Sequence, residues 1–182
     1  MDIVLKNRVE FDKKLDKLST AVKTEIAKSA LYKGAEVIET HAKLNIERHG
    51  LRDKGLLINS IKTYDFKSAG LSSYVWVGSR GVIYNRIHEF GGIISAKRRK
   101  YLAIPMTKTA KKAGSPLNMG ELSFIKTNYG GVLLDKAGEL QYVLKPSVMI
   151  PSRPYLRPAI DENRDRILEV MAKTIEGELK RV

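Results

Sequence analysis

Apolar residues recur at helical spacing near the start of the chain. Over residues 15–46 they return every three or four positions, while Lys and Glu lie mostly on the other face. Ser19-Thr20 is a candidate start, and His49-Gly50 is a candidate end because glycine accepts the left-handed cap conformation. The pattern predicts one long amphipathic helix, with Gly34 either bending it or allowing close packing.

Strand patterns follow this helix. Residues 53–61 form a turn and then an apolar stretch, which suits a short helix or the entry to a strand. Residues 61–66 alternate between apolar and polar, and residues 73–78 are rich in aromatic and β-branched side chains. With Ser68-Ala69-Gly70 as a turn between them, the two segments predict an antiparallel hairpin.

A short helix is predicted next, over residues 84–92. Ile83, Ile87 and Phe90 fall on one helical face, and Gly91-Gly92 ends the turn. We expect Phe90 to be buried, after which the glycine pair lets the chain reverse sharply.

Residues 93–146 have the pattern of an inserted excursion. Residues 101–105 predict a short strand ended by proline, and residues 107–113 predict a basic helix that Gly114-Ser115-Pro116 terminates. A small β-meander is expected after this helix, with strands at 122–127, 132–134 and 140–144 and turns at 128–131 and 136–138.

The C-terminal part predicts a final helix. Pro151 and Pro154 exclude helix before it, and Pro158 suits its first turn. One face of this helix is apolar and carries Ile160, Ile167, Leu168, Met171, Ile175 and Leu179.

These elements predict a single α+β domain over residues 1–182. A long N-terminal helix and a C-terminal helix pack on a mostly antiparallel β-sheet, with the β-meander excursion inserted at 93–146. Residues 1–14 are a possible arm.

Composition narrows the classes of function. The chain has 182 residues, a net charge of +13 and no cysteine. The lack of cysteine excludes disulfides, zinc ribbons, iron–sulfur clusters and thiol catalysis. No apolar run reaches the roughly 20 residues of a membrane span, and no signal peptide is expected at the N-terminus.

The positive charge is concentrated. Residues 81–120 hold eight Lys or Arg and one acid, and the densest point is Lys97, Arg98, Arg99 and Lys100. This run is a candidate contact for DNA or for an acidic partner. The alternative is a solvated loop that keeps the protein in solution, and the spacing itself carries no base-reading information.

The usual catalytic and metal-binding patterns are absent. There is no Walker A sequence, no G-x-G-x-x-G after a strand and no G-x-S-x-G elbow. His41 and His49 lack carboxylates that would complete a metal site, and His88-Glu89 does not continue as H-E-x-x-H. We therefore expect no enzyme, metal or cofactor, and a structural role for His88.

Three segments together resemble a known family. They read G-x-L-x-x-S-I at 55–61, Y-x-x-I-H-E-F-G-G at 84–92 and I-P-x-R-P-Y-L at 150–156. In this order, and with a long helix before them, they resemble the virion morphogenesis family of tailed phages, the Mu-like G tail-completion or head–tail joining proteins. The 93–146 excursion is longer than in compact members of that family.

The resemblance implies a structural phage or prophage protein that assembles as a ring, commonly six-fold. The implied partners are copies of itself, a head connector, and a tail-tube or tail-terminator protein, with DNA as a possible occupant of the ring and no membrane. The implied location is the virion, and the host cytoplasm during assembly. The family-motif residues are His88, Glu89, Phe90, Gly91, Gly92, Arg153, Pro154, Tyr155 and Leu156.

These motif residues suggest structural roles. The prolines stiffen an extended segment from which Tyr155 or Leu156 can dock into the core. Arg153 suits a carboxylate, and Glu89 is its candidate partner; the alternative is that the two are separate surface charges. The other function considered is a stand-alone nucleic-acid-binding protein that uses the basic run, with Tyr101 and Tyr129 as stacking candidates.

Overall fold

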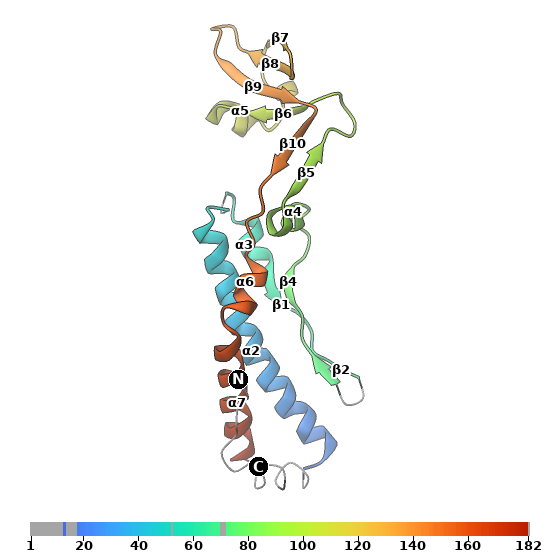
Figure 1. The fold of residues 1–182 in the computed structure, drawn as a ribbon, viewed down its shortest axis with the longest axis vertical. Helices are drawn as coiled ribbons and strands as arrows, with labels where there is room; N and C mark the ends of the chain where they lie inside the picture. The colour runs from blue at the N-terminus through green and yellow to red at the C-terminus, as the bar shows by residue number, and fades with distance from the viewer. Residues whose placement is uncertain (1–12, 14–17, 52, 70–71, 182) are drawn as a thin grey trace. The chain divides into compact units, whose positions relative to one another are not determined.

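The computed structural model describes residues 13, 18–51, 53–69 and 72–181 (Figure 1). Apart from Lys13, the expected arm over residues 1–14 lies outside them. The chain divides into two compact units. Unit 1 comprises Met1–Glu89 and Arg153–Val182, and unit 2 comprises Phe90–Ser152. Unit 2 is wider than the predicted excursion at both ends, because β5 (Gly92–Ser95) pairs with β10 (Ser147–Ile150).

The long N-terminal helix is confirmed as α2 (Thr20–Arg48). The Ser19 hydroxyl caps its start by accepting from the Val22 N–H at 3.4 Å, and Gly50 follows its end at φ 64°. The helix continues unbroken through Gly34, where it packs against α7 (Arg164–Leu179). A Cβ at Gly34 would lie 2.9 Å from Met171 Sδ, so the glycine allows close packing rather than a bend.

The predicted single C-terminal helix is wrong, because it is two helices, α6 (Leu156–Asp161) and α7. Asn163 leaves helical geometry at φ −116° and ψ 15°, and its side-chain amide donates to the Ala159 carbonyl at 3.1 Å. Such local side-chain bonds compete with the helical ladder. Two residues of the predicted apolar face, Ile160 and Leu168, are exposed.

Short elements of unit 1 lie between α2 and the excursion. They are α3 (Leu56–Ser60), β1 (Ile61–Thr63), β2 (Lys67–Ala69), β3 (Ser72–Tyr74), β4 (Val77–Ser79) and α4 (Asn85–Phe90). The expected antiparallel hairpin is confirmed as two consecutive ladders, β1 with β4 and β2 with β3. Ser68 and Ala69 belong to β2, so their predicted place in a turn is wrong.

The core of unit 1 joins segments that are distant in sequence. It consists of Ala42, Ile46, Leu57, Ile61, Tyr155 and Ala159, each at most 3% exposed. Helix α2, the segment from α3 to β1, and the start of α6 therefore meet at one point.

Unit 2 contains the expected β-meander. Its four-stranded antiparallel sheet has the order β6-β9-β8-β7, with β6 at Leu102–Pro105, β7 at Ser123–Thr127, β8 at Gly130–Leu134 and β9 at Leu140–Lys145. Gly130 and Gly131 begin β8, so the predicted turn over 128–131 is shorter than expected. Glycine is required at the start of β8, because a Cβ at Gly130 would overlap the Leu144 carbonyl oxygen.

The predicted basic helix is α5 (Lys108–Ala113), followed by a 3-10 turn, η1 (Pro116–Asn118). The Thr107 hydroxyl caps α5, and Gly114 ends it at φ 72°. The buried Tyr142 hydroxyl donates to the Ala110 carbonyl at 2.9 Å, which ties α5 to β9.

The α+β class is therefore confirmed, with the strands of the described residues in four small antiparallel sheets. Within the described part of the chain, none of the helices combines the length and apolar character needed to cross a membrane.

We predict that Gly34→Leu lowers the free energy of unfolding by about 1–3 kcal/mol, because the larger side chain forces α2 and α7 apart. Met171→Ala in the same chain should restore part of the loss by making room. Gly177→Leu in α7 is the matched control, since a Cβ there meets nothing within 4 Å. Denaturant unfolding measures all three, and equal losses at Gly34 and Gly177 would contradict the close packing.

Candidate functional site

Glu89 holds the start of α6 by its carboxylate. The side chain is 8% exposed, and it accepts backbone N–H bonds from Tyr155 at 2.8 Å, Leu156 at 3.0 Å and Arg157 at 2.9 Å. These groups belong to the first turn of a helix, where N–H donors have no partner within the helix. A buried negative charge is thus matched by three donors and by the positive end of the helix.

Three further bonds fix the segment that leads into α6. The Arg153 N–H donates to the His88 carbonyl at 2.7 Å. The Asn45 side-chain amide donates to the Tyr155 carbonyl at 3.1 Å, and His49 Nε2 lies 3.1 Å from the Pro154 carbonyl oxygen. The two motifs 84–92 and 150–156 are thereby joined to each other and to the end of α2.

This geometry corrects one prediction and leaves another untested. Phe90 is 67% exposed, so its predicted burial is wrong, and Glu89 is buried in its place. The reason is that α4 turns the carboxylate toward the α6 N–H groups. Pairing of the Arg153 side chain with Glu89 stays a prediction. The sequence signal that was missed is the helix start between Tyr155 and Pro158. The N–H groups of such a start need an acceptor, and Glu89 is an acid that supplies one.

The buried Tyr155 and the half-buried His88 have shifted pKa values. Burial, and then the charge of Glu89, raises the pKa of Tyr155 to about 12. Burial also lowers the pKa of His88, and the positive charge of Arg153 lowers it further. His88 Nδ1 is buried without a hydrogen-bond partner among the described residues, and its ring meets Tyr84 edge to face. His88 is therefore favoured in its neutral form.

The glycine pair has a steric role in unit 2. Gly91 adopts φ 69°, and a Cβ there would lie 2.8 Å from the Ser152 nitrogen. Gly92, at φ 142°, also has a backbone conformation that favours glycine. The two ends of unit 2 therefore run close together at this point.

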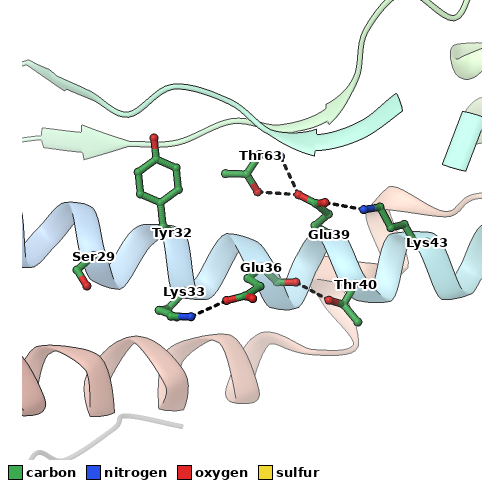
Figure 2. A pocket seen from close by; sticks show the side chains of 8 residues that line it. All are labelled: Ser29, Tyr32, Lys33, Glu36, Glu39, Thr40, Lys43 and Thr63. Atoms are coloured by element: carbon green, nitrogen blue, oxygen red, sulfur yellow. Dashed lines mark hydrogen bonds and ion pairs between the residues drawn. The ribbon is translucent and has the colours of Figure 1, made fainter. Parts of the chain in front are cut away.

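A polar hollow of about 640 Å³ lies beside α2 in unit 1 (Figure 2). Glu39 accepts from Lys43 at 2.6 Å and from the Thr63 N–H at 2.8 Å, which ties α2 to β1. Burial raises the pKa of Glu39, but the bonds from Lys43 and Thr63 outweigh it, so that the pKa is lowered. Lys33 pairs with Glu36 at 2.9 Å on the same helix. These carboxylates are already engaged, which is typical of structural ties.

The predicted basic run borders a second hollow, in unit 2. This hollow has a volume of about 700 Å³, and Arg98, Arg99 and Lys100 lie on its wall. Tyr101 also lines it, and Lys100 Nζ lies 5.6 Å from the centre of the Tyr101 ring. Tyr129 does not line this hollow but lies in the turn between β7 and β8, where it is 86% exposed.

Metal ligands do not gather in the described part of the chain, where no three His, Cys, Asp or Glu side chains are placed to hold an ion. His49 contacts the Pro154 carbonyl, as described above. Comparison of the chain with protein-family models, with curated proteins and with solved structures found no match.

We predict that Glu89→Gln lowers the free energy of unfolding by about 2–3 kcal/mol, because the amide turns an NH₂ group toward a buried backbone donor. Glu162→Gln, on an exposed residue at the end of α6, is the matched control. Chemical denaturation at neutral pH measures both variants. A loss at Glu89 no larger than at Glu162 would show that the carboxylate does not hold the helix start.

A second prediction concerns Tyr155→Phe at high pH. The folded pKa of about 12 lies above the ordinary value of 10, so the stability from the protonated hydroxyl is complete below pH 10. It is lost as pH rises toward 12, and the wild type should lose roughly 2 kcal/mol relative to the variant over that range. Denaturant unfolding against pH measures the difference, with the exposed Tyr129→Phe as control. Parallel profiles for wild type and Tyr155→Phe would contradict the burial of an ionisable hydroxyl.

Proposed function

We propose that the protein is a structural component of phage or prophage virion morphogenesis, acting in tail completion or head–tail joining as a homo-oligomeric ring. The observation that carries this proposal is the meeting of three sequence elements. Leu57 and Ile61 come from the first, Glu89 from the second and Tyr155 from the third, and they lie in or beside one core. Motif residues that stabilise one another in this way suit a shared scaffold more than a catalytic site.

The β5–β10 ribbon supports self-assembly. Among the described residues it has two strands, and ribbons of two strands are marginal in water unless something packs on them. Ile93 and Met149 face each other across it, 64% and 74% exposed. An exposed apolar cross-strand pair suits a surface that another copy of the chain covers.

A ring requires two different complementary faces on each copy. Unit 1 offers a second apolar surface, a hollow of about 420 Å³ lined in part by Leu56, Val82, Ile83 and Tyr84. Ile83 is 99% exposed and Leu56 is 58% exposed. The ribbon of one copy and this hollow of the next are the faces that we assign to the ring contact.

The first test is the solution mass of the purified protein by light scattering across concentration. We expect a mass near six times 20.4 kDa at high concentration. Met149→Asp should shift the mass toward that of the monomer, because it places a charge in the contact. Met106→Asp is the matched control, a methionine 54% exposed in the same unit but outside the ribbon.

A monomer at every concentration would contradict self-assembly of the isolated chain. Equal loss of mass in Met149→Asp and Met106→Asp would contradict the ribbon as the contact. Thermal unfolding of both variants separates loss of contact from loss of fold.

A further inference from the structure

Positive and negative charge are separated within unit 2. The unit holds ten Lys or Arg and three Asp or Glu, and seven of the cations lie between Lys97 and Lys112 with no acid among them. The three acids belong to the other end of the unit's sequence. Glu121 pairs with Lys136 at 3.1 Å, and Asp135 accepts from the Gln141 amide at 2.7 Å.

The cations of the 97–100 run are uncompensated. Among the residues that the structure describes, none of these four pairs with a carboxylate, and all four side chains lie in an exposed loop. Four adjacent positive charges repel one another in the folded state. A polyanion removes this repulsion and gains from the counterions that it releases.

The hollow beside this run combines charged and apolar lining residues. Arg98, Arg99 and Lys100 supply the charge, and Ala103, Leu133 and Leu144 come from the sheet. Leu117 of η1 also lines the hollow and is 74% exposed. A volume of about 700 Å³ is in the range of sites that enclose a small organic group.

We infer that this hollow binds single-stranded nucleic acid. The phosphates contact Arg98, Arg99 and Lys100, and one unpaired base enters the hollow against Tyr101 and Leu117. Guanidinium groups bind phosphate oxygens through paired N–H donors, and bases stack on aromatic and planar side chains whatever their sequence. We therefore expect the site to bind single strands without preference for base sequence.

The apolar lining residues favour a single strand over a duplex. In a duplex the bases are stacked inside, so that contact would use the cations and leave Leu117 and Leu133 uncovered. An acidic peptide also supplies negative charge, but a nucleic-acid strand repeats an anion beside every flat apolar group. The repeated phosphates can contact the consecutive cations while a base between them enters the hollow.

The inference uses residues of unit 2 alone and does not depend on ring formation. A protein that stays monomeric but binds through the hollow would contradict the ring and support the site. A ring that does not bind nucleic acid would do the reverse.

The experiment is fluorescence anisotropy of a labelled oligothymidylate of about 20 nucleotides, titrated between about 50 and 300 mM salt. The test variant is Arg98→Gln/Arg99→Gln/Lys100→Gln. The control is Lys126→Gln/Lys136→Gln/Lys145→Gln, which removes the same charge from the three cations of unit 2 outside 97–112. We expect the test variant to lose more than about tenfold in affinity and to reduce the salt slope by about 2, against little change in the control.

Leu117→Gln tests the apolar part of the lining without changing charge. We expect it to weaken oligothymidylate binding by several-fold, with the salt slope unchanged and binding to a duplex of equal length unaffected. Thermal unfolding checks that each variant is folded.

Three results would overturn the inference. One is equal loss in the two triple variants, which would mean that only total charge matters. Another is that a duplex binds as tightly as the single strand and that Leu117→Gln has no effect on binding. This result would show that the 97–100 loop binds duplex DNA through its charge alone. The third is displacement of the oligonucleotide by an acidic, aromatic peptide at lower concentration than by unlabelled oligothymidylate.

Discussion

The interaction on which unit 1 depends is the bond between the Glu89 carboxylate and the start of α6. A buried carboxylate is costly unless hydrogen bonds match its charge, and here three backbone N–H groups do so. The same bonds satisfy donors that a helix leaves unpaired at its first turn. The backbone N–H of Tyr155 is one of these donors, and its side chain belongs to the core. The hydrogen bond to Glu89 and the apolar packing therefore position the same residue.

This interaction lies where the chain leaves unit 1 and where it returns. Glu89 is the last residue before unit 2, and Arg153 is the first after it. The Arg153 N–H donates to the His88 carbonyl, so both ends of the insertion are joined within unit 1. Because the two ends of the inserted unit 2 are held together within unit 1, the insertion adds little loop-closure cost to the folding of unit 1.

The sequence predicted elements whose cause is local, and it missed those whose cause is tertiary. Ser19, Gly50 and Gly114 mark helix ends by their own chemistry, so both ends of α2 and the C-terminal end of α5 were predicted. Burial of Glu89 in place of Phe90 depends on α6, which lies more than 60 residues away in the chain. Periodicity favours the apolar residue at such a position. The basic run was visible as charge, whereas the hollow beside it needs β6, β8 and η1 together.

The two units use their charged side chains differently. In unit 1 the buried Glu89 and the half-buried Glu39 are used within the fold, where backbone donors and Lys43 match their charges. In unit 2 the run from Lys97 to Lys100 has no acid near it in sequence and makes no ion pair among the described residues. Charge that does not stabilise its own fold costs self-repulsion, which salt screens in part and a partner of opposite sign offsets further. The hollow bordered by Arg98, Arg99 and Lys100 is therefore the surface on which the fold leaves unpaired positive charge for a partner.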